Sequence, residues 1–470
     1  MKHVLSLMAA SLVSMQAAEK PNILFIFADD LAYDCVGAYG NKEVKTPNLD
    51  KLSASGTQFT YAYNSGAWHG AVCVASRTML MTGKQIWNAK TTKLGDHAGA
   101  GKFWPQRMNK AGYTTYFAGK WHVGSASLPK QVFNHVRNVR GGMPNQTKER
   151  YNRNFTPGQD DWSPFDKSKQ GFWKGGKHWS EVLADDATSF FKQVQSDEKP
   201  FFMALCFNAP HDPRQAPESY QKMYPYKNIT VPSSYMDLYP HEIGSNRIRD
   251  EKLGPFPRTK YSVQVNRSEY FALISHMDTQ IGRILDELEK SGKADKTIII
   301  FSADHGLACG HHGLLGKQNM YDHSVRVPWI ISGPGIPKGK SVDAPIYLQD
   351  AMATSLALAG AESDGVEFKS VIPVIKGDGA REQIYSCYTN HQRMIRVGEY
   401  KLISYPRIEV EKLFNIKADP FEEKDLAKDP EQAPRIKQLR TQLLDEMKRM
   451  NDPMAVTDAT GRKGSLSRKK

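Results

Sequence analysis

Four short apolar runs, rich in β-branched and aromatic residues, constrain the fold more than any other feature of the sequence. They cover residues 23–28, 113–118, 201–207 and 297–303. Runs that are apolar on both faces are typical of strands buried between two layers of helices. Helical patterns at 47–54, 182–194 and 268–290 alternate with them. The sequence therefore predicts an α/β fold, with an open sheet sandwiched by helices.

Each of these runs is followed within a few residues by charged or reactive side chains. The residues concerned are Asp29 and Asp30, Lys120 and His122, His211, and Asp304 and His305. In open α/β sheets, ligands bind beyond the carboxyl ends of the strands. We therefore expect these side chains to share one edge of the sheet and to form an active site there.

The pattern changes beyond about residue 365. Short strand-like runs at 383–388, 394–397 and 401–403 precede a helical stretch at 431–450. They predict a small antiparallel sheet with one helix, a C-terminal subdomain over 366–455 that follows an α/β domain over 19–365. The basic tail 456–470 is predicted to be disordered.

Residues 1–18 read as a secretory signal peptide, with a basic start, a short apolar run and small residues near Ala18. No other stretch has the roughly 18 apolar residues of a membrane span, so we expect an exported protein, periplasmic or extracellular, without stable membrane insertion. The five cysteines lack the spacing of metal sites. Their odd number in an exported chain suggests that one of them has another role.

The formal net charge of +13 favours an anionic partner. No nucleic-acid-binding signature is present, so we expect no nucleic acid partner. A basic surface that only keeps the protein in solution is the competing interpretation. Two long segments interrupt the α/β alternation, and loops of this length are usually functional or disordered. Residues 141–179 contain three tryptophans, and residues 241–267 are rich in arginine and lysine.

Residues 73–84 read CVASRTMLMTGK, and four further motifs occur in order along the chain: PNILFIFADD, FAGKWHVG, APHDP and SADHG with HHGLLGKQNMYDHSVRVP. Together they resemble the formylglycine-dependent sulfatases, a family of the alkaline phosphatase-like superfamily that includes exported bacterial glycan sulfatases. The resemblance implies a mixed central sheet and the hydrolysis of sulfate esters.

The resemblance assigns the nucleophile to Cys73. In the family this cysteine is oxidised to formylglycine, whose hydrate supplies one hydroxyl for attack and another that expels sulfate. Cys73 opens a predicted helix, where backbone N–H groups favour negative charge, and Arg77 lies one turn further along the same face. Ala75 stands where proline is commoner, which resembles substrates of the anaerobic radical-type maturase. Lys84 replaces the family's usual arginine.

The resemblance also implies one calcium ion, bound by Asp29, Asp30, Asp304 and the modified Cys73. Carboxylate oxygens suit this hard cation. His305 stands where asparagine is common in the family. It is assigned as a further ligand, but a nitrogen ligand leaves manganese or zinc open, and His305 could instead touch the sulfate.

Four basic residues align with the family's sulfate pocket. By this resemblance His122 deprotonates the second hydroxyl, Lys120 steadies the hydrated aldehyde, and His211 and Lys317 bind sulfate and protonate the leaving alcohol. A sulfated glycan is the expected substrate, because cations attract sulfates and aromatic rings stack on sugars. A phosphonate monoester or phosphodiester hydrolase of the same superfamily is the nearest alternative. A secreted glycan-binding pseudoenzyme is another.

Overall fold

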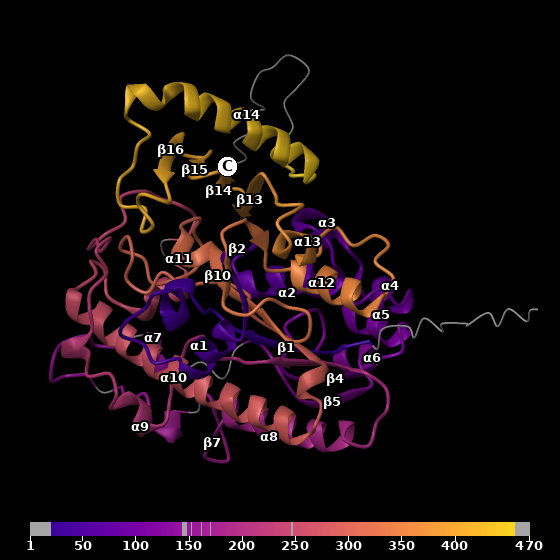
Figure 1. Cartoon of the computed structure of the whole chain (residues 1–470). Helices are drawn as coiled ribbons and strands as arrows, with labels where there is room; N and C mark the ends of the chain where they lie inside the picture. The colour runs from indigo at the N-terminus through magenta and orange to yellow at the C-terminus, as the bar shows by residue number, and fades with distance from the viewer. Residues whose placement is uncertain are drawn as a thin grey trace, which may run out of the picture.

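The computed structural model describes residues 20–142, 148–151, 153–160, 162–169, 171–245 and 248–455. Its centre is a nine-stranded sheet in the order β11-β2-β10-β9-β1-β8-β4-β5, with β12 also paired to β2 (Figure 1). The strands are β1 (Asn22–Ala28), β2 (Gly56–Tyr63), β4 (Thr114–Lys120), β5 (His135–Arg140), β8 (Phe201–Cys206), β9 (Thr297–Ala303), β10 (Arg326–Ser332), β11 (Lys340–Val342) and β12 (Ile346–Tyr347).

The sheet is mixed, as expected. β1 pairs in parallel with β8 and β9, and β4 pairs in parallel with β8 and β5. β10 runs antiparallel to both of its neighbours, β9 and β2. Every residue of β1 and β8 is buried, because helices cover both faces of the sheet. The carboxyl ends of β1, β4, β8 and β9 consequently meet at one edge of the sheet.

Two groups of helices form the outer layers. α8 and α10 pack against each other, and α1 and α9 pack against α10; α2, α5 and α12 contact one another as a second group (Figure 1). The helices are α1 (Pro47–Ala54), α2 (Val72–Thr82), α3 (Ile86–Thr91), α4 (Leu94–Gly99), α5 (Trp104–Lys110), α6 (Pro129–Val132), α7 (Lys148–Tyr151), α8 (Trp179–Val194), α9 (Glu218–Gln221), α10 (Lys260–Lys290), α11 (Asp322–Val325), α12 (Asp350–Ala359), α13 (Ile372–Ile375) and α14 (Ala433–Arg449).

A second sheet of five strands, in the order β16-β15-β14-β13-β3, lies beneath α14 at the top of the view in Figure 1. Its strands are β3 (Gly66–Ala67), β13 (Gln383–Tyr388), β14 (Gln392–Val397), β15 (Tyr400–Tyr405) and β16 (Val410–Asn415). β13 to β16 pair antiparallel, whereas β3 pairs in parallel with β13. One strand of this sheet thus comes from the segment between β2 and α2. A hairpin of β6 (Trp173–Lys174) and β7 (Lys177–His178) precedes α8.

The sequence patterns located the central strands but not every boundary. α10 begins at Lys260, eight residues before the predicted start, because its first turns bury polar residues such as Ser262, Asn266 and Arg267, which obscure the apolar periodicity. Thr46 precedes α1, but its side chain does not cap the helix: the hydroxyl donates to Asp50 and accepts from the backbone N–H of Gly37. The predicted signal peptide 1–18 and tail 456–470 lie outside the described residues. None of the described helices combines the length and the apolarity needed to cross a bilayer.

Candidate active site

Three aspartates converge beyond the carboxyl ends of β1 and β9. Asp29 and Asp30 follow β1, and Asp304 follows β9. All three are buried, and the backbone N–H of Asp30 donates to Asp304 Oδ1 at 3.1 Å. Asp30 adopts a left-handed conformation with φ of 63°, which turns its carboxylate out of the strand direction. One carboxylate oxygen from each aspartate lies within 4.8 Å of the others and of Cys73 Sγ.

Cys73 is the second residue of α2, whose N-terminus faces this cluster. Its Sγ lies 3.2 Å from Lys317 Nζ and 3.8 Å from Asp30 Oδ1. Burial raises the pKa of the Cys73 thiol well above its usual value, and the charges of Asp29 and Asp304 raise it further. The unmodified thiol therefore stays protonated at neutral pH and is a poor nucleophile.

Three buried cations surround the aspartates. Arg77, one turn along α2, donates from Nε to Asp304 Oδ2 at 2.8 Å and from Nη1 to the carbonyl oxygen of Lys120 at 2.9 Å. Lys120 forms an ion pair with Asp29. Lys317 Nζ contacts both carboxylate oxygens of Asp30, at 2.7 and 2.5 Å. These cations keep the crowded carboxylates in one arrangement.

The cluster has the properties of a cation site. Asp29 Oδ1 is buried and has no hydrogen-bond partner among the described residues. Burial, and then the charge of Asp304, raise the pKa of Asp29 to about 6. Three convergent carboxylates with one unsatisfied oxygen fit a hard divalent cation such as calcium. The ring nitrogens of His305 do not join this group within 4.8 Å, and its Nδ1 lies 3.2 Å from the carbonyl oxygen of Gly306.

His122 follows β4 and also has a left-handed backbone, with φ of 57°. Its Nδ1 is buried without a hydrogen-bond partner among the described residues. Gly142 packs directly on the ring, where a Cβ atom would overlap the imidazole. Burial, followed by the charges of Lys120 and Arg77, lowers the pKa of His122 to about 2. The imidazole is therefore neutral at neutral pH, and in these surroundings it is a weak base.

The pKa of His211 is shifted in the opposite direction from that of His122. Burial and the charge of Lys317 act to lower its pKa, but the carboxylates of Asp30, Asp212 and Asp29 outweigh them, so the pKa of His211 is raised. Its Nδ1 lies 2.8 Å from the carbonyl oxygen and 3.1 Å from Oδ1 of Asp212, while Nε2 lies 3.5 Å from Asp30 Oδ2. His211 is therefore placed to donate a proton.

Sequence reasoning did not single out the residues that surround His211. Tyr151, at the end of α7, donates its hydroxyl to Asp212. Arg249 donates to Asp250, and Asp250 accepts from Gln318, the neighbour of Lys317. Both Tyr151 and Arg249 come from the two long segments that interrupt the α/β alternation. The length of those segments was the one signal in the sequence that could have found these residues.

The tryptophans of segment 141–179 serve as packing residues. Trp162 is buried, and Trp173 and Trp179 are partly buried. Trp179 packs under Arg140, whose guanidinium carbon lies 4.3 Å from the ring centroid, and Trp173 packs edge-on against His178. The prediction that these rings present a stacking surface for sugars gains no support from their burial.

Arg258 and Arg249 of the basic segment 241–267 form contacts within the protein. Arg258 is only 2% exposed, pairs with Glu251, and donates to the carbonyl oxygens of Gly254 and Gly313. Arg258 therefore anchors the loop and cannot contact a polymer. Arg249 is part of the network beside the active site, and Arg247 lies outside the described residues.

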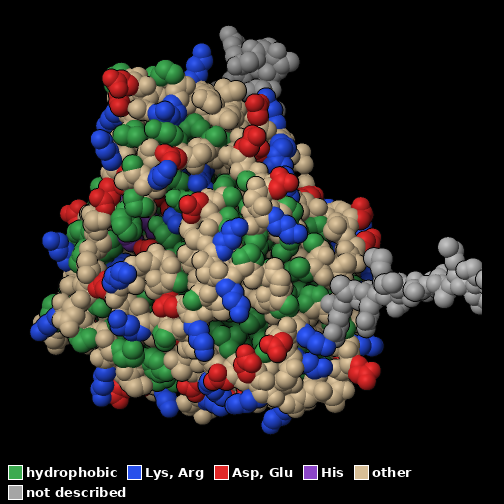
Figure 2. All heavy atoms as spheres, in the orientation of Figure 1, with side chains coloured by type: hydrophobic (Ala, Val, Ile, Leu, Met, Phe, Trp, Pro, Cys, Tyr) green, Lys and Arg blue, Asp and Glu red, His purple; other side chains and the backbone are tan. Residues whose placement is uncertain are grey.

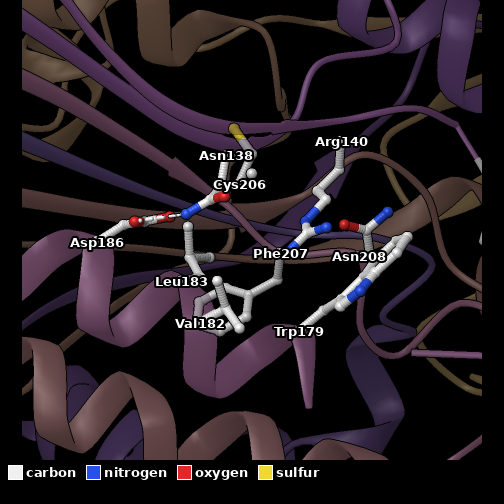
Figure 3. A pocket seen from close by; sticks show the side chains of 10 residues that line it. Asn138, Arg140, Trp179, Val182, Leu183, Asp186, Cys206, Phe207 and Asn208 are labelled. Atoms are coloured by element: carbon white, nitrogen blue, oxygen red, sulfur yellow. Dashed lines mark hydrogen bonds between the residues drawn. The ribbon is translucent and has the colours of Figure 1, made fainter. Parts of the chain in front are cut away.

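A small cavity of about 10 Å³ lies beside the end of β4 (Figure 3). Arg140, Trp179 and Asn208 line it, and each has a buried N–H group without a hydrogen-bond partner among the described residues. Figure 3 shows the guanidinium of Arg140 next to the amide of Asn208, above the Trp179 ring. A cavity of this size holds about one water molecule, which could accept bonds from two of these donors.

The surface shown in Figure 2 carries Lys and Arg side chains spread among Asp and Glu. No large patch of a single sign is visible on this face. The net positive charge of the chain is therefore dispersed over this face.

Residues 21–361 match the family model described as "Sulfatase", and residues 310–449 match the model for the C-terminal region of N-sulphoglucosamine sulphohydrolase. Among curated relatives, an arylsulfatase of Clostridium perfringens is 28% identical, with 91% of this chain and 94% of that protein covered. An N-acetylglucosamine-6-O-sulfatase of Bacteroides thetaiotaomicron is 27% identical, with 96% and 90% covered.

Solved structures share the fold. One, described as a complex with its substrate D-glucosamine-2-N,6-O-disulfate, has a TM-score of 0.72 and 24% identity, covering 93% of this chain and 99% of that one. The phosphonate monoester hydrolase of Agrobacterium radiobacter has a TM-score of 0.70 and 21% identity, covering 92% and 96%. At these identities the likeness is evidence for the fold alone.

Proposed function

Because this chain belongs to the sulfatase family, we propose that it releases inorganic sulfate from a sulfated carbohydrate, with a formylglycine made from Cys73 as nucleophile and one bound calcium ion. The observation that carries the proposal is the convergence of Cys73 Sγ with the carboxylates of Asp29, Asp30 and Asp304 at the N-terminus of α2. Sulfate ester hydrolysis itself follows from the family; the nucleophile, the cation and the substrate class are the proposed parts.

Cys73 needs the modification because its thiol is protonated and buried. Formylglycine at this position would supply the hydroxyl that attacks sulfur. Oxidation of the thiol to the aldehyde requires a maturase, for which Ala75 favours the anaerobic radical type. Asp29, Asp30 and Asp304 would hold calcium, which would supply positive charge to the sulfate oxygens.

The two histidines suit opposite proton transfers. His211, with its raised pKa, would donate a proton to the leaving alcohol. His122, whose imidazole is neutral, would take a proton from the second hydroxyl at residue 73, the role that the family resemblance gives it. Lys120 and Lys317 reach the aspartates and Cys73, so they would hold the nucleophile and the sulfate oxygens in place. His305 is proposed as a further ligand through Nε2, because its Nδ1 faces a backbone carbonyl; contact with the sulfate is the alternative role.

A carbohydrate substrate is supported by a curated relative. The Bacteroides thetaiotaomicron relative is named an N-acetylglucosamine-6-O-sulfatase. The signal-like residues 1–18 support export to the periplasm or the extracellular space, where sulfated polysaccharides are accessible.

A phosphonate monoester or phosphodiester hydrolase is the second candidate, favoured by the shared fold of the Agrobacterium enzyme. A glycan-binding pseudoenzyme is less well supported, because it would not need Cys73, three aspartates and His211 to converge.

The test uses protein co-expressed with a radical-type maturase. Mass spectrometry of the peptide that contains Cys73 should reveal conversion of the thiol to the aldehyde. The modified protein should release sulfate from sulfated oligosaccharides and from an aryl sulfate faster than it releases phosphate or phosphonate from matched esters. Chelation should reduce the rate, and calcium should restore it.

The control is Cys73→Ala, which should fold normally, since a helix start tolerates alanine, and release no sulfate. Full activity with an unmodified thiol would overturn the proposed nucleophile. Faster release of phosphate than of sulfate would favour the second candidate. Restoration by zinc but not by calcium would overturn the choice of cation.

A further inference from the structure

A second polar cavity, of about 440 Å³, lies at the seam between the central sheet and the five-stranded sheet. Its walls come from both sheets, and none of its residues belongs to the reaction centre. The lining residues used below are Tyr61 of β2, Arg326 of β10, Asp343, Glu382, Arg396 of β14 and Gly398 of the β14–β15 turn. A volume of this order accommodates a sugar unit.

Two arginines on the inner wall stack on the same aromatic ring. The guanidinium carbons of Arg326 and Arg396 lie 4.2 and 4.0 Å from the ring centroid of Tyr61. The attraction between each guanidinium and the aromatic ring holds both side chains in the wall of the cavity.

Arg396 is the cation without a partner. It is 6% exposed, donates from Nε to the carbonyl oxygen of Gly398 at 3.2 Å, and has no partner at Nη1 among the described residues. It also forms no ion pair with a residue that the structure describes, whereas Arg326 is 3.5 Å from Asp322. A buried guanidinium with a free N–H group costs free energy unless a ligand or water accepts from it.

The other cations of the cavity already have partners. Arg381 pairs with Asp350 at 2.5 Å, and Lys417 pairs with Glu399 at 2.6 Å. Among the described residues that line the cavity, Arg396 is thus the cation that has no ion pair and can bind an anionic ligand. Its planar guanidinium suits the oxygens of a sulfate or a carboxylate.

The rim of the cavity carries carboxylates. Asp343 accepts a hydrogen bond from Thr60, and Glu382 is exposed. Carboxylates accept hydrogen bonds from hydroxyl groups but repel a ligand that is charged along its whole length, such as a nucleic acid. The buried Arg396 and the carboxylates of the rim therefore suit a ligand that carries one anionic group and several hydroxyl groups.

We propose that this seam cavity is a noncatalytic binding site for an anionic saccharide unit, whose sulfate or carboxylate group binds Arg396. The saccharide identity rests on the proposed function, whereas the anion site rests on the geometry of Arg396. Such a site would hold a polymeric substrate on the enzyme while another of its units is in the reaction centre, which raises affinity through multivalency.

Gly398 offers a matched pair of variants. It lines the cavity beside Arg396, its φ is +56°, and a Cβ atom there meets nothing within 4 Å. Asn and Asp tolerate this left-handed conformation best among residues with side chains. Gly398→Asp and Gly398→Asn therefore impose the same backbone strain and nearly the same bulk, but only the former adds negative charge near Arg396.

The test is calorimetric titration of the full-length Cys73→Ala protein, which cannot turn over, with glucose 6-sulfate, glucuronate and neutral glucose. We expect the Gly398→Asn protein to keep a site for at least one of the two anionic sugars, and the Gly398→Asp protein to bind at that site at least ten-fold more weakly. The affinity for neutral glucose should be the same in the Gly398→Asn and Gly398→Asp proteins. The sugar that binds shows whether sulfate, carboxylate or both are accepted.

Identical isotherms for the Asp and Asn variants would overturn the proposal, as would equal binding of neutral glucose at the affected site. Failure of the proposed function would be visible elsewhere, as absent sulfate release by the matured enzyme with Cys73 intact. In that enzyme, Gly398→Asp should leave turnover of a small aryl sulfate unchanged and raise KM for a sulfated oligosaccharide.

Discussion

At the scale of single residues, Arg77 shows how a buried side chain organises the reaction centre. It bonds Asp304 through Nε and the backbone of Lys120 through Nη1, and Nη2 lies 3.8 Å from Asp29. The Arg77 guanidinium therefore contacts residues at the carboxyl ends of three different strands, β1, β4 and β9. Lysine at this position would keep the charge but could reach only one of these partners.

We expect Arg77→Lys to lower kcat/KM for an aryl sulfate by about 100-fold, the order found when one preorganised donor is removed from an active site. Steady-state kinetics on the matured enzyme checks this. Lys84→Arg is the control, because Lys84 lies on the same stretch of chain but pairs with Glu367 at 3.2 Å, outside the reaction centre. Near-normal activity of Arg77→Lys would show that charge alone, without the fork geometry, is sufficient.

At the scale of elements, the short strand β3 connects the central domain to the five-stranded sheet. Gly66 begins it with φ of 98°, and a Cβ atom there would overlap the carbonyl oxygen of Cys387 in β13. The close approach of the two strands thus requires glycine, both for its backbone conformation and for the missing side chain.

Gly66→Ala should therefore destabilise the protein by about 3 kcal/mol or more, among the larger effects of single substitutions. Gly40→Ala provides the comparison. Gly40 has a similar φ of 102°, but a Cβ atom there meets nothing within 4 Å, so only the backbone cost of about 1–2 kcal/mol applies. Urea unfolding of both variants measures the difference. Equal losses of unfolding free energy in Gly66→Ala and Gly40→Ala would mean that β3 can move away from β13 at little cost.

At the scale of the whole molecule, a buried charge cluster joins the two parts of the chain. Lys401 of β15 contacts Asp322 of α11 at 2.7 Å and Glu422 at 2.6 Å. Glu422 also accepts from the backbone N–H of Asp322 at 2.6 Å. Burial, with a contribution from Asp322, raises the pKa of Glu422 to about 7, although Lys401 acts in the opposite direction.

The raised pKa of Glu422 makes the free energy of unfolding depend on pH. Between the unfolded pKa of Glu, about 4.3, and about 7, the folded protein holds a proton that the unfolded chain has released, so this group makes stability fall as pH rises. From pH 5 to pH 8, the free energy of unfolding of the wild-type protein should fall by up to about 3 kcal/mol relative to that of Glu422→Gln. Urea midpoints at the two pH values test this, with the exposed neighbour Glu423→Gln as the charge control. A constant difference between wild type and Glu422→Gln would contradict the shift.

The residue patterns of the chain by themselves determined the central strands and the reactive groups at their ends. Strand β1 and the aspartates that follow it are local features, since apolar periodicity and the residues next to it can be read from a few consecutive positions. The same applies to β13 and to α1, whose bounds the patterns matched. The motif around Cys73 likewise identified the family before any contact was known.

Only the tertiary structure decided which side chains meet and which are buried. Arg258 and Arg249 look alike in the sequence, yet one is locked to Glu251 inside a loop and the other lies beside the active site. His305 and His211 both follow strands, but His211 Nε2 lies 3.5 Å from Asp30, whereas His305 Nδ1 faces the carbonyl oxygen of Gly306. The contact of Arg77 with Asp304 joins residues 227 positions apart in the chain. Contacts of this range depend on how whole elements pack, which no local pattern encodes.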